Sequence, residues 1–237
     1  MNNELLNRVV VSNAFARKSK LNLSCIEYKV LLYMISKITF KQSKFLDECI
    51  DLKRCAKAFD VSSYSLINDA CLSLENLKIG DDKVFEYIEV YDGEIFFKFH
   101  DSLADKLLKQ KSNMTIFDLG YIYNLKSKYS IRLYLFALSF RNLHYYNLEE
   151  TELKRVFQAP LPKSEFERRV INRAVQEVNQ NTNINVCCKY YDGRYFFFCR
   201  EKTKDEKTLF CIDDWRNSRD AKPYSVIGKE MFEEFEV

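Results

Sequence analysis

An internal repeat of about 100 residues constrains the fold of this chain more than any other feature of its sequence. The segment Tyr91-Asp92-Gly93-x-x-Phe96-Phe97 recurs at Tyr191-Asp192-Gly193-x-x-Phe196-Phe197, an offset of 100. The tripeptide Leu52-Lys53-Arg54 recurs at Leu153-Lys154-Arg155, an offset of 101, and the apolar pattern of 28–35 recurs in 129–136 at that same offset. Because three segments recur in the same order, we expect two copies of one domain.

Local patterns predict the elements of the first copy. Apolar residues at helical spacing over 23–38 predict a helix, which Ser24 caps with Glu27 three positions later. A short helix over 52–59 and a third helix from Ser63 to about Lys78 follow, with a stop at Gly80. Two aromatic and β-branched runs, 83–90 and 95–100, then meet at Asp92-Gly93, which favours a tight hairpin turn. This order of elements is that of a winged helix.

The second copy repeats the order, with helices over 127–143, 149–157 and 164–179 and a hairpin over 185–200. We therefore predict an α+β chain of two tandem winged-helix domains, each a helix-turn-helix with a β-hairpin wing. The expected boundaries are 1–112, 113–202 and a C-terminal tail, 203–237. The tail carries Thr208-Leu209-Phe210, which is faintly similar to a clamp-binding peptide, and Trp215 as a second candidate anchor, but the sequence assigns it no role.

Charge is distributed unevenly along the chain. Residues 1–112 hold 17 basic and 16 acidic side chains, 113–200 hold 13 and 8, and 201–237 hold 7 and 10. The first hairpin is acidic and the second, with Lys189, Arg194 and Arg200, is basic. Positive charge suits phosphates, so we expect the second copy to be the main DNA reader and the first to be a weaker one that suits protein contact.

The helix that begins near Ser164 is the candidate recognition helix. At about 100° per residue, its apolar residues cover one half of the circumference. The other half presents Arg168, Arg169, Asn172 and Gln176, whose forked donors and acceptors match base edges in the major groove. Arg173 at the border, together with Lys163, Ser164 and the free N–H groups of the helix start, suits phosphate. The alternative is an ordinary solvated helix face, balanced by Glu165 and Glu167.

Composition excludes several function classes. Five glycines form neither a P-loop nor a dinucleotide-binding motif. Eight cysteines form no C-x-x-C pair and the two histidines, His100 and His144, are far apart in the sequence, so we expect buried reduced thiols and no metal site. So few histidines leave little for a catalytic triad, and we expect neither enzyme activity nor a cofactor. The longest apolar runs, 30–35 and 133–138, are too short to span a bilayer, and no signal peptide is apparent, so we expect a cytoplasmic protein without membrane contact.

The chain resembles the bacterial plasmid replication initiators that bind iterons through two winged-helix domains. The most specific segment is Leu125-Lys126-Ser127-Lys128-Tyr129-Ser130-Ile131-Arg132-Leu133-Tyr134, which is similar to the family signature at the start of the second domain. Further similarity lies in 10–13, 21–38 and 166–182, and the resemblance spans roughly residues 8–200. The turn at 158–163 departs from the family pattern because it is short and carries two prolines.

The resemblance implies a protein that binds direct repeats at a plasmid origin as a monomer, promotes opening of the adjacent duplex and recruits host replication proteins. It also implies a homodimer, joined through the first domain, that binds an inverted repeat and represses its own gene. Phosphate contacts from Lys126, Lys128, Lys189 and Arg194 would offset the cost of bending DNA, of order 1 to 6 kcal/mol. Two alternatives stay open: a tandem winged-helix transcription repressor without a replication role, and a protein-interaction module without DNA affinity.

Overall fold

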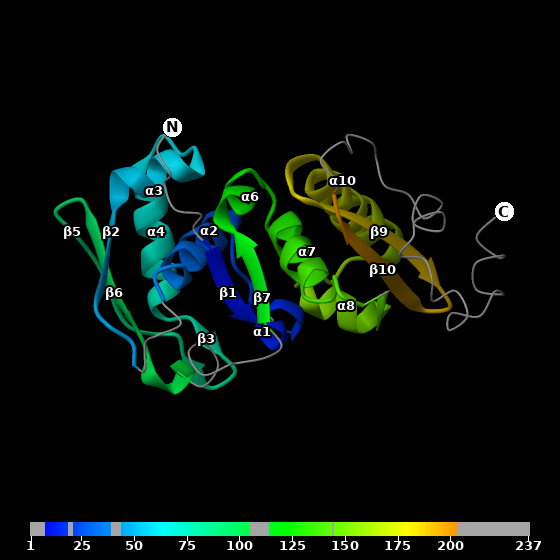
Figure 1. Ribbon diagram of the computed structural model, residues 1–237, viewed down its shortest axis with the longest axis horizontal. Helices are drawn as coiled ribbons and strands as arrows, with labels where there is room; N and C mark the ends of the chain where they lie inside the picture. The colour runs from blue at the N-terminus through cyan, green and yellow to red at the C-terminus, as the bar shows by residue number, and fades with distance from the viewer. Residues whose placement is uncertain (1–7, 19–20, 39–43, 105–113, 144, 203–237) are drawn as a thin grey trace.

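The computed structural model describes residues 8–18, 21–38, 44–104, 114–143 and 145–202 (Figure 1). The first half contains β1 (Arg8–Ser12), α1 (Asn13–Lys18), α2 (Cys25–Ile35), β2 (Glu48–Asp51), α3 (Leu52–Phe59), α4 (Tyr64–Glu75), β3 (Lys78–Ile79), β4 (Asp82–Lys83), β5 (Phe85–Tyr91), β6 (Glu94–Phe99) and the 3-10 turn η1 (Asp101–Leu103). The second half contains β7 (Met114–Asp118), α6 (Leu119–Tyr123), α7 (Lys128–Leu138), β8 (Tyr146–Glu149), α8 (Glu150–Val156), α9 (Lys163–Phe166), the π-helical turn η2 (Glu167–Ile171), α10 (Asn172–Asn181), β9 (Ile184–Tyr191) and β10 (Arg194–Glu201).

Each half is a winged helix, as the sequence predicted. The wing of the first is a sheet of order β2-β6-β5, and that of the second has the order β8-β10-β9. Both hairpin tips use an Asp-Gly pair at positive φ, 49° and 78° at Asp92 and Gly93, and 44° and 75° at Asp192 and Gly193. In both halves the carbonyl of this glycine accepts the first backbone N–H of the short helix that precedes the hairpin in the chain, from Leu52 of α3 at 2.9 Å and from Glu150 of α8 at 3.0 Å. The two wings lie at opposite ends of the molecule (Figure 1).

The duplication is present, but the register of its helices differs from the predicted offset of 101. The first long helices begin after equivalent N-caps, Ser24 and Ser127, so that α2 and α7 correspond at an offset of 103. The short helices α3 and α8 end at equivalent positive-φ residues, Asp60 at 55° and Gln158 at 50°, an offset of 98. Leu52 is therefore the first residue of α3, whereas Leu153 is the fourth residue of α8. The recurring Leu-Lys-Arg tripeptide does not mark equivalent positions, because insertions and deletions in the loops separate the helices from the hairpins.

A two-stranded sheet that the sequence did not predict joins the two halves. Strands β1 and β7 pair antiparallel from Arg8 opposite Asp118 to Ser12 opposite Met114. They lie at the centre of the molecule between α2 and α7 (Figure 1). Residues of both halves belong to one hydrophobic core, in which α2 is buried along almost its whole length. The boundary at 112/113 stays a prediction.

Equivalent basic side chains link the halves reciprocally. Lys29 of α2, with 6% exposed, donates from Nζ to the carbonyl of Tyr123 at 2.9 Å. Arg132, its equivalent on α7 with 2% exposed, donates to the carbonyls of Phe15 and Val156, each at 3.4 Å. Burial lowers the pKa of both groups. Each half thus places one cation against a main-chain carbonyl of the other half.

Lys29 also lines a cleft between the halves, which has a volume of about 580 Å³. Its lining includes the carboxyl ends of three helices: α3 at Asp60, α6 at Asn124 and α10 at Asn181. Helix C-termini carry partial negative charge. The ammonium of Lys29 in the lining supplies the compensating positive charge, so this cleft is part of the interface between the halves.

Several helix bounds differ from the predicted ones. The capping box of Ser24 and Glu27 is confirmed, but α2 ends at Ile35 and α7 at Leu138, before the predicted 38 and 143. Ser63 precedes α4 without a side-chain cap, and α4 ends at Glu75, because 78–83 form the small β3–β4 hairpin around Gly80. The short strands β2 and β8, which close each wing sheet, were also missed. Periodicity does not reveal strands of four residues or the fraying of a helix end.

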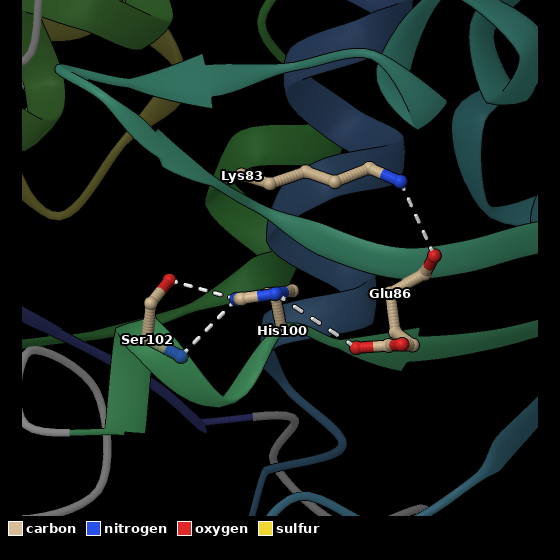
Figure 2. Close-up of polar contacts among 4 residues, drawn as sticks. All are labelled: Lys83, Glu86, His100 and Ser102. Atoms are coloured by element: carbon tan, nitrogen blue, oxygen red, sulfur yellow. Dashed lines mark hydrogen bonds and ion pairs between the residues drawn. The ribbon is translucent and has the colours of Figure 1, made fainter.

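The base of the first wing is tied by polar contacts around His100 (Figure 2). Its Nδ1 accepts the backbone N–H of Ser102 at 3.2 Å and so caps η1, while Nε2 lies 4.0 Å from a carboxylate oxygen of Glu86. Lys83 donates to the Glu86 carbonyl at 3.3 Å. All four residues are at least partly exposed, so this cluster is a set of surface contacts at the end of the β5–β6 hairpin.

The cysteines in the described part of the chain are free thiols. Cys55, Cys71, Cys187 and Cys199 are buried, as predicted for structural thiols, and burial raises the pKa of Cys55 and of Cys71 to about 12. Cys49 is exposed, against the expectation, because it lies on the solvent side of β2. Cys211 and the Thr208-Leu209-Phe210 and Trp215 candidates lie outside the described residues. Within the described ranges, no helix combines the length and apolarity that a bilayer crossing requires.

Candidate nucleic-acid interface

The predicted recognition helix is helical at every residue from Lys163 to Asn181, through α9, the π-helical turn η2 and α10. Its inner face, built from Phe166, Val170, Ile171, Ala174 and Val178, is buried in the core. The predicted base-reading and phosphate candidates on this helix are all exposed: Lys163, Ser164, Arg168, Arg169, Asn172, Arg173 and Gln176. The structure therefore places these seven side chains together on the solvent side of one helix.

A π-helical turn, Glu167–Ile171, interrupts this helix and was not predicted. Such turns are frequent at functional sites because they shift the side chains that follow. Glu167, at its start, accepts a hydrogen bond at 3.1 Å from the hydroxyl of Tyr195 on β10. Tyr195 is 1% exposed, and burial followed by the nearby Glu167 carboxylate raises its pKa. This contact links the wing to the turn that carries Arg168 and Arg169.

The start of the recognition helix lies against the wing. Pro162, not Ser164, precedes the first helical residue, and no side chain caps the free N–H groups of the first turn. The ammonium of Lys163 lies 3.2 Å from the centre of the Tyr190 ring on β9. Pro162 is the N-cap residue, with φ −53° and ψ 150°, and its ring restricts the backbone directly before the first helical residue. Uncapped N–H groups next to a lysine form a local site suited to phosphate.

The exposed arginines differ in how free they are. Arg169 forms an i,i+4 ion pair with Glu165, at 3.5 Å, on the first turns of the helix. Arg168 and Arg173 form no ion pair with any residue that the structure describes. An exposed pair of this kind contributes roughly 0.3 to 0.5 kcal/mol, so Arg169 can exchange Glu165 for another anion at low cost.

The two wing candidates are also placed differently. Strand alternation puts Lys189 and Arg194 on the face of the β8-β10-β9 sheet that points away from the core. Arg194 donates to Asn147 at 2.8 Å and to Glu149 at 3.1 Å, both on β8. Its charge is therefore partly neutralised within the wing, while Lys189 forms no ion pair among the described residues.

Lys126 precedes and Lys128 begins α7, and backbone N–H groups at this helix start are already bonded within the protein. Ser127 caps the first turn of α7 by accepting the N–H of Tyr129 at 3.2 Å. Glu177 of α10 accepts the backbone N–H of Lys126 and the hydroxyl of Ser130, so its carboxylate lies where a phosphate was expected. Lys128 donates to Asn22, at 3.3 Å, in the first half. The side chain of Lys126 is exposed beside α10. The sequence carried no signal for Glu177, because the contact spans 51 residues.

The equivalent helix of the first winged helix, α4, presents a different surface. Asn68, Asp69, Ser73 and Asn76 are exposed, and no arginine accompanies them. Tyr64, Leu66 and Leu72 are exposed as well, and they were not anticipated. The tip of this wing exposes Tyr91 to 76% between Glu89 and Asp92. The two recognition-type helices thus differ in charge, with the basic one in the second half.

Comparison with known families matches both halves. Residues 8–137, more than half of the chain, match the family described as initiator replication protein, WH1. Residues 149–195 match initiator Rep protein, WH2. No curated protein gives a significant match. The WH1 match covers the first winged helix and continues through β7 and α6 into α7, and the WH2 match covers α8, the recognition helix and the start of β10. The chain therefore belongs to the plasmid replication initiator family, whose members act through DNA-binding winged helices.

Proposed function

We propose that this initiator binds direct repeats, iterons, at its plasmid origin and that its second winged helix reads their base sequence. The observation that carries the proposal is the difference between the two recognition-type helices. The second exposes Arg168, Arg169, Asn172 and Gln176 in one row, whereas α4 exposes Asp69 and no arginine. Arginine matches guanine, and asparagine and glutamine match adenine, in the major groove.

Phosphate contacts would orient the helix in the groove. The candidates with the least internal competition are Arg173, Lys163 with the uncapped N–H groups beside Ser164, Lys126 and Lys189. Arg194 and Lys128 already have partners, so their contribution would be smaller. A set of such contacts would offset a DNA bend that costs of order 1 to 6 kcal/mol.

The remaining steps need no bond chemistry by this chain. Bound at tandem repeats as a monomer, it would promote opening of the neighbouring A·T-rich duplex and recruit host replication proteins. As a homodimer joined through the first winged helix it would bind an inverted repeat and repress its own gene. The acidic wing and the exposed Tyr64, Leu66 and Leu72 of the first half are surfaces suited to protein contact.

The test is fluorescence-anisotropy binding to tiled duplexes from the DNA that flanks the gene, over a salt series. Arg168→Ala should weaken binding to the specific duplex by about 1 to 3 kcal/mol and random duplex far less, while Lys189→Ala should weaken all duplexes alike and lower the salt slope by about one. Asn76→Ala on α4 is the matched control and should change neither.

Tight monomer binding to tandem direct repeats is the expected result. Binding only to an inverted repeat as a dimer would favour a repressor. Absence of DNA binding would favour an interaction module and refute the proposal. Equal losses on specific and random duplex from Arg168→Ala would refute the assignment of base reading to this helix.

A further inference from the structure

Part of the outer face of the second wing sheet, around Phe196 and Phe198, is buried, although it does not belong to the core. Along β10, Tyr195, Phe197 and Cys199 point into the core, and Phe196 and Phe198 alternate with them on the opposite face. Phe198 is 0% and Phe196 7% exposed, and neither ring joins the core cluster. Tyr145 is the described aromatic that meets both rings, at centroid distances of 6.0 and 6.4 Å. One ring cannot bury a whole sheet face, so this face has a further cover.

The first wing shows that the fold itself does not require an apolar outer face. At the hairpin offset of 100, Phe198 corresponds to Lys98 and Cys187 to Tyr87. Lys98 and Tyr87 are partly exposed, whereas Phe198 and Cys187 are buried. Two sheets of the same topology thus differ in polarity and burial on this one face. The apolar residues of the second wing are therefore explained by a contact that the first wing lacks.

Asn185 indicates which chemical groups cover this face of the sheet. It lies opposite Arg200 on the same outer face and is 1% exposed. Neither amide atom of its side chain has a hydrogen-bond partner among the described residues. Buried amides in proteins are almost always paired. The cover must therefore offer main-chain or polar side-chain groups next to Asn185 and apolar groups next to Phe196 and Phe198.

The chain's own C-terminal segment meets these requirements. The described part ends at Lys202, directly after β10, and 35 further residues, 203–237, follow. They contain an apolar stretch, Leu209-Phe210-Cys211-Ile212 with Trp215. Leu209 lies seven positions after Lys202, and at about 3.3 Å per residue this span reaches well past Phe198, which lies four positions before Lys202. The segment holds 6 basic and 9 acidic side chains, against 13 and 8 in 113–200, so charge also favours the contact.

We propose that the outer face of the second wing sheet is the docking site of the C-terminal segment, with Leu209–Trp215 packed on Phe196 and Phe198. An uncovered aromatic face of this kind promotes self-association, so the docked segment keeps the second winged helix monomeric on this side. The proposal is independent of which bases or phosphates the recognition helix contacts.

Trp215 is the only tryptophan of the chain, which makes the test direct on the full-length protein. In the native protein its emission should be blue-shifted and shielded from acrylamide. Phe198→Lys, which installs the residue of the first wing, should shift the emission to the red and raise the quenching constant toward that of the unfolded chain. Phe96→Lys, the same change of side chain on the outer face of the first wing, should leave both unchanged. Circular dichroism establishes that each variant is folded.

A second variant keeps the test valid if Phe198→Lys does not fold. Leu209→Asp combined with Phe210→Asp alters only the segment and should increase binding of a hydrophobic dye to the native protein. Trp215 equally quenched in native and unfolded protein would overturn the proposal. Shielding of Trp215 that is lost on dilution would also overturn the proposal, because the segment on this sheet face would then come from a second copy of the chain.

Discussion

Replacing Tyr195 by phenylalanine removes one hydroxyl from the contact between the second wing and its recognition helix. This hydroxyl donates to Glu167 at 3.1 Å, at the start of the π-helical turn. The phenylalanine ring retains the packing of Tyr195 against Phe166 and Tyr190, at centroid distances of 5.9 and 4.9 Å. The substitution therefore isolates the effect of the hydrogen bond.

The expected loss of stability follows from the surroundings of the two groups. A hydrogen bond to a charged group contributes about 1.5 to 3 kcal/mol. Glu167 is only half-buried, so water can solvate its carboxylate after the hydroxyl is removed. We therefore expect the lower end, about 1 to 2 kcal/mol in the free energy of unfolding. For a chain of this length, that lowers Tm by roughly 2 to 8 °C.

The effect on DNA binding should be larger for specific than for random sequence. Without the hydrogen bond to Tyr195 of β10, we expect the π-helical turn to relax toward regular helical geometry, which would move Arg168 and Arg169. Losing one well-aligned arginine–guanine contact costs about 1 to 3 kcal/mol. The specific Kd should therefore rise roughly 5- to 150-fold, whereas binding to random duplex, which depends on the unchanged number of cations, should stay the same.

The assay is anisotropy on specific and random duplex, combined with thermal unfolding of the same preparations. Tyr87→Phe is the matched control, because Tyr87 also donates to a carboxylate, Asp47 at 2.7 Å, but in the first wing. The reasoning is refuted if Tyr195→Phe loses stability while the ratio of specific to random affinity is unchanged. It is equally refuted if both variants lower that ratio to the same extent.

Three further predictions concern charges around the site. Glu165→Gln removes the ion-pair partner of Arg169 and one negative charge from the start of the recognition helix. An exposed pair contributes up to about 1 kcal/mol, so affinity for every duplex should rise by about two- to fivefold. Unchanged or weaker binding in the same anisotropy assay would contradict this. Glu177→Gln weakens the hydrogen bonds to the Lys126 N–H and the Ser130 hydroxyl, so the free energy of unfolding measured in urea should fall by about 1 to 3 kcal/mol. An unchanged urea midpoint of unfolding would show that this carboxylate does not hold α7 to α10. The hydrogen bond to Asp47, followed by burial, raises the pKa of Tyr87 to about 12. The stability that this contact contributes is therefore fully present below pH 10 and is lost as the pH rises through about 12. Tyr87→Phe should flatten this part of the dependence of stability on pH, and an unchanged dependence would contradict the prediction.

The recognition helix was predictable because the evidence for it is local. A helix turns by about 100° per residue, so the positions of Phe166, Val170 and Ala174 place Arg168, Asn172 and Gln176 on the other side. The hairpin tips were predictable for the same reason, since Asp-Gly sets the turn without help from the remaining chain. The buried and exposed faces of α4 were predictable only in part, because Leu66 and Leu72 are exposed although periodicity assumes that apolar residues are buried.

The alignment of the two copies illustrates where sequence reasoning failed. Identical letters at Leu52-Lys53-Arg54 and Leu153-Lys154-Arg155 suggested equivalence, but helix caps set the true register and these letters occupy different turns. The basic residue inside each apolar helix, Lys29 and Arg132, was a usable signal. A charged residue in an otherwise buried run normally has a partner, and here each partner lies in the other half.

The sequence by itself determined the order of helices and hairpins, the duplication, the basic face of the second recognition helix and the resemblance to replication initiators. These depend on interactions between residues that are close along the chain. Only the tertiary structure decided that β1 pairs with β7, that Glu177 occupies the start of α7, that Arg194 is engaged within its wing and that Tyr195 donates to Glu167 at the start of the π-helical turn. Each of these contacts joins residues from 28 to about 110 positions apart, and no local pattern encodes which distant partner will lie within hydrogen-bond distance once the core has packed.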